Sequence, residues 1–176
     1  MSRLRNSRGV TLVEIVVYML VSSIVLVAVG ALFGSINGMF ANSRTRNEAK
    51  LVGDAVYSLI SEELRFATYL SCYGSSGDTA GSSDISINGG RVILDGQDVF
   101  GEEFYLGNTV EIETADINAF SLSLTVRVMD RDGEQRYETG SAIETINLKL
   151  LGAGGIMYSP DSDINPKISY TRGAKP

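Results

Sequence analysis

The chain of 176 residues contains no histidine, no tryptophan and a single cysteine, Cys72. Histidine is the side chain most often used as a general base and as a metal ligand near neutral pH. Its absence excludes a Ser–His–Asp triad and every histidine metal centre. A lone cysteine cannot form a disulfide within the chain, so this protein must depend on its hydrophobic core. We expect Cys72 to be a small buried apolar residue rather than a link between chains.

Proline and charged residues are also absent from long segments of the chain. The three prolines, Pro160, Pro166 and Pro176, all lie near the C-terminal end, so none interrupts a helix that we expect from Val10 to about Leu70. No charged residue occurs between positions 15 and 43. An apolar run of this length is long enough to cross a bilayer as a helix.

Basic residues are outnumbered by acidic ones, 15 against 21, which gives a formal net charge of −6. An acidic exterior repels the phosphate backbone of nucleic acids. We therefore expect no direct contact with nucleic acid. Histidine-dependent catalysis is excluded already and no phosphate-binding loop is present, so we expect that the protein is not an enzyme and needs no cofactor.

One carboxylate, Glu14, stands near the start of the apolar run. A charge inside a membrane costs a few kcal/mol unless it is paired, so such a residue suggests a function. Three arginines, Arg3, Arg5 and Arg8, precede the run and are followed by Gly9. Basic residues on this side favour an N-terminus that stays in the cytoplasm.

The segment Gly9-Val10-Thr11-Leu12-Val13-Glu14 resembles the cleavage and methylation signature of type IV prepilins and type II secretion pseudopilins. In that family a prepilin peptidase cuts after the glycine of a short basic leader, and the new N-terminal residue is methylated. The resemblance implies cleavage between Gly9 and Val10, N-methylation of Val10 and a role for Glu14 in filament assembly. Val10 replaces the usual phenylalanine, and Ala31 stands where many members have proline.

The same resemblance implies partners and a location. The partners are other pilins or pseudopilins, the prepilin peptidase and methylase, a membrane assembly platform and, before assembly, lipid. The protein would first cross the cytoplasmic (inner) membrane once, with its C-terminal part outside the cytoplasm, and then enter an extracellular or periplasmic filament. Loss of residues 1–9 would leave 12 basic residues against 21 acidic ones, a net charge of −9.

A second resemblance favours a minor subunit. Ile60, Glu63, Leu64, Arg65 and Ala67 match an L-x-x-D/E-L-R-x-A pattern of PilW-type minor pilins and the minor pseudopilin J. The function it implies is a minor pilin of a type IV pilus.

Two alternatives stay open. The filament could instead belong to a type II secretion or competence system for DNA uptake. The apolar run could also be an ordinary signal anchor that carries an extracellular domain for an unknown ligand, although a signal h-region of 7–15 residues does not begin with a carboxylate.

A series of glycines, Gly30, Gly34 and Gly38, occurs late in the apolar run. This small-xxx-small spacing lets helix backbones approach closely in a bilayer. Each glycine also weakens the helix by about 1 kcal/mol relative to alanine. The series therefore indicates either helix packing or a point where the helix extends during polymerisation.

The remaining sequence predicts an α+β fold in which a long N-terminal helix packs on an antiparallel β-sheet. Its boundaries are a leader at 1–9, a transmembrane and assembly helix at 10–43, an amphipathic continuation at 44–72, a β-sheet head at 73–151 and an irregular tail at 152–176. The amphipathic face is formed by apolar residues three or four positions apart, Val52, Val56, Ile60, Leu64 and Ala67.

The head shows the period of two that is typical of strands. A Gly/Ser-rich loop at 73–83 precedes predicted strands at 91–94, 109–113 and 120–128. An Asp-Gly turn at 130–133 then predicts a hairpin with a returning strand at 134–139. Alternate apolar residues predict a last strand at 146–150. The apolar face of this sheet must be covered, and the amphipathic half of the helix is the available cover.

Three short acidic segments could donate oxygen ligands to Ca²⁺. They are Asp130-x-Asp132-Gly133, Asp95-Gly96-Gln97-Asp98 and Asp161-x-Asp163. None completes an EF-hand loop, and aspartate and glycine are also the ordinary residues of turns. The sequence therefore predicts no metal site.

Overall fold

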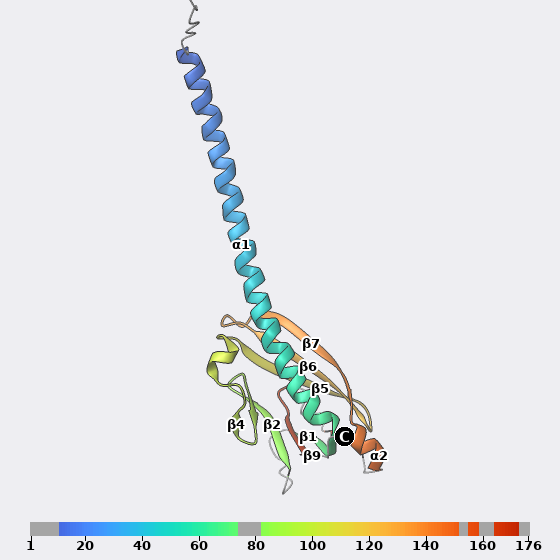
Figure 1. The fold of residues 1–176 in the computed structure, drawn as a ribbon. Coiled ribbons are helices and arrows are strands. Elements are labelled where there is room, and N and C mark those ends of the chain that lie inside the picture. Colours follow the sequence, from blue (N-terminus) through green and yellow to red (C-terminus); the bar gives the residue numbers. More distant parts are fainter. Residues whose placement is uncertain (1–10, 74–81, 152–154, 159–163, 173–176) are drawn as a thin grey trace, which may run out of the picture. The chain divides into compact units, whose positions relative to one another are not determined.

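The computed structural model describes residues 11–73, 82–151, 155–158 and 164–172. The chain divides into two units, residues 1–44 and 45–176. Helix α1 (Leu12–Arg65) forms the described part of the first unit and continues into the second (Figure 1). The described part of the second unit contains two β-sheets and two short helices, which together with α1 make the predicted α+β fold.

Helix α1 buries one face in the second unit. The buried residues lie on one side of the helix, three or four positions apart except for one adjacent pair, and are Ala49, Val52, Gly53, Val56, Ile60 and Leu64. This spacing confirms the predicted packing of an amphipathic helix on a sheet.

The end of α1 differs from the prediction. The helix ends at Arg65, and residues Ala67–Tyr73 form strand β1 instead of continuing the helix to Leu70 or beyond. Leu70, Ser71 and Cys72 are all buried, so consecutive residues of β1 are covered on both faces of its sheet. Pairing with a distant strand overrides the helical pattern here, because tertiary context decides where local preferences are weak.

Strand β1 belongs to a six-stranded sheet with the order β4-β3-β2-β9-β1-β8. All its neighbours are antiparallel except β1 and β8, which are parallel. The other members are β2 (Ser83–Asn88), β3 (Arg91–Leu94), β4 (Gln97–Asp98), β8 (Met157–Tyr158) and β9 (Lys167–Arg172).

The position of β9 corrects the prediction of an irregular tail. This strand lies between β1 and β2 and contributes the buried residues Ile168 and Tyr170 to the core. Pro166 stands just before β9 and so removes no hydrogen bond from the sheet. Pro166 therefore immediately precedes a strand and does not indicate that a strand is absent.

A second, three-stranded sheet has the order β5-β6-β7 and is antiparallel throughout. Its strands are β5 (Thr109–Asn118), β6 (Ser121–Met129) and β7 (Gln135–Glu144). The alternating apolar residues of β6 are buried, as predicted, from Leu122 to Val128. The β6–β7 hairpin also forms at the predicted turn, where the Gly133 N–H donates to the Asp130 carbonyl at 3.1 Å.

The last predicted strand is a helix instead. Residues Ile146–Leu151 form α2, and the Lys149 N–H donates to the carbonyl of Thr145 at 3.3 Å. Leu148 is 1% exposed whereas Leu150 is 77% exposed, so the alternating residues do not share a buried face. The short helix places Leu148 in the core without extending the sheet.

Helix α1 packs closely against the three-stranded sheet at Gly53. A Cβ atom added there would lie 2.7 Å from Cδ1 of Tyr137 and 3.1 Å from Cγ2 of Val128. The Tyr137 hydroxyl donates to Oδ1 of the neighbouring Asp54 at 2.7 Å. Glycine at position 53 is therefore required by the packing of the Tyr137 ring.

We expect Gly53→Ala to destabilise the protein by about 1–3 kcal/mol, because the Tyr137 ring must move and its bond to Asp54 weakens. Elsewhere in a helix this substitution stabilises by up to about 1 kcal/mol. Urea unfolding measures the change. Ser58→Ala, on the exposed face of the same helix, is the control and should be close to neutral. A gain in stability from Gly53→Ala would contradict the close approach.

Candidate functional site

The N-terminal end of α1 carries the predicted assembly residue. The Glu14 N–H donates to the Thr11 carbonyl at 3.0 Å and lies 3.4 Å from Thr11 Oγ1. Thr11 therefore caps the helix, with Glu14 three positions later in its first turn. A carboxylate at this end is favoured by the helix dipole. Gly9 and Val10, the predicted cleavage and methylation residues, lie outside the described residues.

The surface around Glu14 is apolar over many turns. Large hydrophobic side chains from Leu12 to Phe40 are exposed, and the most apolar 18-residue window of α1 has a mean hydropathy of 2.7 with no residue buried. By length and composition the helix could cross a membrane. An exposed apolar surface this large requires lipid or the helices of other subunits around it.

The three glycines of the predicted packing series have free space where a side chain would lie. A Cβ atom at Gly30, Gly34 or Gly38 would have no neighbouring atom within 4 Å. No contact within the described chain therefore requires glycine at these positions. A role in packing against another helix stays a prediction.

The comparison with family models bears directly on this segment. Residues 4–30 match the prokaryotic N-terminal methylation motif. The match supports a type IV pilin-like protein. It spans Gly9, Val10 and Glu14, and it implies processing by a prepilin peptidase and assembly with other pilins. Comparison with curated proteins and with solved structures found no match.

These findings agree with a protein that is first anchored in a membrane by an N-terminal helix and later enters an extracellular filament. The motif ends within the apolar part of α1 and does not reach the second unit. Any function of the second unit must therefore be argued from its own structure.

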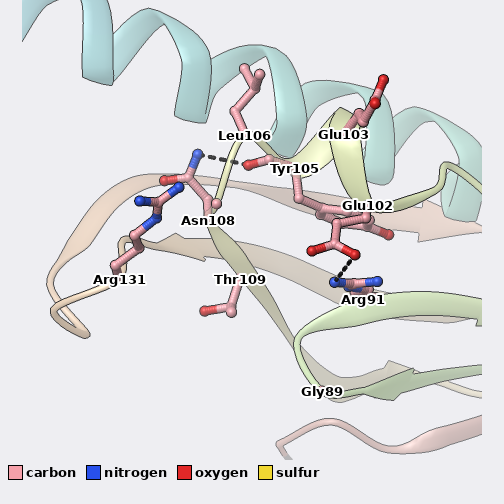
Figure 2. A pocket seen from close by; sticks show the side chains of 10 residues that line it. Gly89, Arg91, Glu102, Glu103, Tyr105, Leu106, Asn108, Thr109 and Arg131 are labelled. Atoms are coloured by element: carbon pink, nitrogen blue, oxygen red, sulfur yellow. Dashed lines mark hydrogen bonds and ion pairs between the residues drawn. The ribbon is translucent and has the colours of Figure 1, made fainter.

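A pocket of about 520 Å³ opens in the second unit, beside the short helix η1 (Glu102–Tyr105) (Figure 2). Its lining comes from the β2–β3 turn, η1 with the residues after it, and the β6–β7 turn. These residues are Gly89, Arg91, Glu102, Glu103, Tyr105, Leu106, Gly107, Asn108, Thr109 and Arg131.

Tyr105 and Asn108 hold this pocket in shape. The Tyr105 hydroxyl accepts the N–H of Val92 at 2.9 Å, and burial raises the pKa of the phenol. The Asn108 side-chain amide donates to the Tyr105 carbonyl at 3.0 Å. Sequence reasoning missed this pocket, because its residues come from three separated segments and carry no motif.

The carboxylate of Asp130, in the first of the acidic turns, bonds to backbone N–H groups and to an arginine. Oδ1 of Asp130 accepts the N–H groups of Asp132 and Glu134, each at 2.9 Å, and Oδ2 pairs with Arg136 at 2.6 Å. The bond from the Glu134 N–H, followed by the contact with Arg136, lowers the pKa of Asp130. Its oxygens are therefore already occupied.

An aspartate of a second acidic segment also accepts backbone hydrogen bonds. Oδ1 of Asp98 accepts the N–H groups of Phe100 and Gly101 at 3.2 and 3.1 Å. Asp161 and Asp163 lie outside the described residues. Within the part of the chain that the structure describes, no three histidine, cysteine, aspartate or glutamate side chains are grouped so as to hold a metal ion.

Cys72 is buried, as predicted, and forms no disulfide within the described chain. Burial, with a smaller contribution from the negative charge of Asp116, raises the pKa of its thiol from 9.0 to about 12. The folded state therefore favours the neutral thiol, and this contribution to stability is present below pH 9 and is lost as the pH rises towards 12.

We expect a chromogenic disulfide reagent at pH 8 to modify Cys72 only after unfolding, because the thiolate is the reactive form. The absorbance of the released thiol, followed in native buffer and in guanidinium chloride, measures this difference. Equally fast labelling under both conditions would contradict the burial of Cys72.

Proposed function

We propose that this chain is a minor structural subunit, a minor pilin, of a type IV pilus. After prepilin peptidase cleavage, its N-terminal helix enters the fibre with the help of the assembly platform in the cytoplasmic membrane. The single observation that carries this proposal is Glu14, which stands at the capped end of a long exposed apolar helix inside a matched methylation motif.

The chemistry of assembly follows from charge. Cleavage after Gly9 creates a cationic amine on Val10. In the core of a fibre, where helices exclude water, that amine and the Glu14 carboxylate of a neighbouring subunit neutralise each other. A subunit that slips along the fibre leaves both charges buried and unpaired. The ion pair between the Val10 amine and Glu14 therefore fixes the position of each subunit along the fibre axis. It also lowers the free energy needed to bury the two charges.

The end of α1 supports a minor subunit. Glu63 Oε2 accepts the Tyr170 hydroxyl at 2.9 Å and Nε of Arg172 at 3.1 Å, so it ties the helix to β9. Leu64 and Ala67 are buried beside it. The glutamate, leucine and alanine of the PilW-like pattern thus each have a structural reason to be present in this fold.

The test is the N-terminus of the mature chain. We expect mass spectrometry of protein isolated from its native membranes to find Val10 first, carrying one additional methyl group. An N-terminus further along the apolar helix would indicate signal-peptide cleavage, and an intact N-terminus would indicate a signal anchor. Either result would contradict the proposal.

A pseudopilin of a type II secretion or competence system is the second candidate, because the same motif serves those filaments. The two are separated by deleting each assembly platform in turn and measuring this subunit in sheared fibres. A fibre fraction that depends on a secretion or competence platform would favour the second candidate. Nucleic-acid binding is disfavoured for either, because the mature chain would carry a net charge of −9.

We expect Gly9→Val to block processing, because the residue before the cut must fit closely and glycine is the only residue without a side chain. Uncut precursor should accumulate in the membrane fraction, as seen by its mobility on immunoblots. Ser7→Val, two positions earlier in the leader, is the control and should still be cut. Mature protein of normal mobility from Gly9→Val would contradict the assigned cleavage site.

A further inference from the structure

The pocket of Figure 2 contains an arginine whose charge is not neutralised by the residues that the structure describes. Arg91 is paired with Asp98 at 3.8 Å and with Glu102 at 3.4 Å. Arg131 lines the other end of the pocket and makes no ion pair within the described chain. The carboxylate of Glu103 is turned away from Arg131 in this view.

The guanidinium of Arg131 lies against the backbone of Gly107. A Cβ atom at Gly107 would be 2.4 Å from Nε, 2.5 Å from Nη2 and 2.8 Å from Cζ of Arg131. Gly107 also has a φ of 84°, a conformation that residues with a side chain rarely adopt. Glycine is thus required for the guanidinium to occupy this position beside the pocket.

Asn108 supplies an acceptor to the same pocket. The residue is only 8% exposed, and its side-chain nitrogen is engaged by the Tyr105 carbonyl. Its carboxamide oxygen therefore points the other way, and Figure 2 shows it on the side of Arg131. Thr109 and Glu102 add a hydroxyl and a carboxylate to the same lining.

We propose that this pocket binds an acidic sugar, a uronate, through its carboxylate and ring hydroxyls. Gly107 faces the Nε–Nη2 edge of the Arg131 guanidinium, so the Nη1–Nη2 edge is the donor pair that would bind a carboxylate in a bidentate manner. The Asn108 oxygen, the Thr109 hydroxyl and the Glu102 carboxylate accept hydrogen bonds from hydroxyl groups. The volume of about 520 Å³ lies in the range of small-ligand sites.

The composition of the lining selects a sugar over an apolar ligand. The Tyr105 ring is buried in the protein, so Leu106 is the only exposed large apolar side chain at the pocket. The chain as a whole is acidic, with a formal charge of −6, and repels anions at long range. Binding of a carboxylate here must therefore depend on the local charge of Arg131.

The test uses the full chain purified in detergent micelles and titrated with D-glucuronate and with D-glucose, its neutral counterpart. Saturation-transfer NMR measures binding. We expect glucuronate to bind at least tenfold more tightly than glucose. Arg131→Met should lower glucuronate affinity tenfold or more, because a charge-assisted bidentate contact is lost. Arg131→Lys keeps the positive charge but not the paired donors of the guanidinium. Its affinity for glucuronate should therefore fall between that of the wild type and that of Arg131→Met.

The matched control is Arg136→Met, which removes an arginine of the same hairpin that pairs with Asp130 and does not line the pocket. It should leave glucuronate binding unchanged, while far-ultraviolet circular dichroism shows that each variant is folded. Unchanged affinity of folded Arg131→Met, or equal binding of glucose and glucuronate, would overturn the proposal. So would acetate or an acetylated dipeptide binding as tightly as glucuronate, since the sugar ring would then contribute nothing.

Discussion

Glu14→Val should be cleaved normally and then fail to enter fibres, so that its recovery in sheared filaments falls tenfold or more. In the proposed mechanism, processing depends on Gly9 and the leader, whereas pairing in the fibre depends on the carboxylate of Glu14. The variant removes a costly charge from the apolar helix and should be at least as stable in the bilayer. In the fibre, however, the amine of Val10 on a neighbouring subunit loses its counter-ion in an apolar core.

Two further variants sharpen this experiment. Glu14→Gln keeps the shape of the side chain but not its charge, so it should behave like Glu14→Val rather than like the wild type. Val13→Leu changes the adjacent residue without changing charge and should assemble normally. The measurement is the ratio of this subunit in the fibre fraction to that in the membrane fraction. Unchanged recovery of Glu14→Val would show that Glu14 does not set register, or that the subunit occupies a tip position with no neighbour to pair with.

The second large effect is expected in the core of the second unit. Ile60 is fully buried on the face of α1 that covers the sheets. Ile60→Asp removes a buried aliphatic side chain, at a cost of about 2–5 kcal/mol. It also places an unpaired carboxylate in an apolar environment. Because a domain is stable by only about 5–15 kcal/mol, we expect the variant to be largely unfolded or to melt far below the wild type.

This experiment can be done on a fragment beginning at Arg44, which we expect to fold as a monomer because the covering helix face is retained. Should the fragment not fold, the full chain in detergent gives the same comparison. Ser58→Asp places the same carboxylate on the exposed face of α1 and should change stability by less than about 0.5 kcal/mol. An unchanged melting curve for Ile60→Asp would show that α1 does not pack on the sheets.

Features that depend on neighbours in sequence were predictable from the sequence. The uncharged run, its single carboxylate Glu14 and the preceding Gly9 are local patterns, and the family comparison matched the same residues. The buried face from Val52 to Leu64 follows from helical periodicity, since it depends only on the geometry of one helix. The Asp130–Gly133 hairpin was predictable for the same reason, because turn chemistry is set by a few adjacent residues.

Only the tertiary structure decided the features that depend on distant partners. The helix ends at Arg65 because the residues after it pair with β9, about 100 positions later in the chain. That pairing also makes a central strand of a segment that appeared irregular between prolines. The pocket arises likewise, since Arg131, Gly107 and Arg91 come from separate segments and meet only when the fold is complete. The sequence alone determined the apolar helix and the methylation motif at its start, because that information is local. The tertiary structure decided what the second unit presents to its surroundings, because that depends on contacts between residues far apart in the chain.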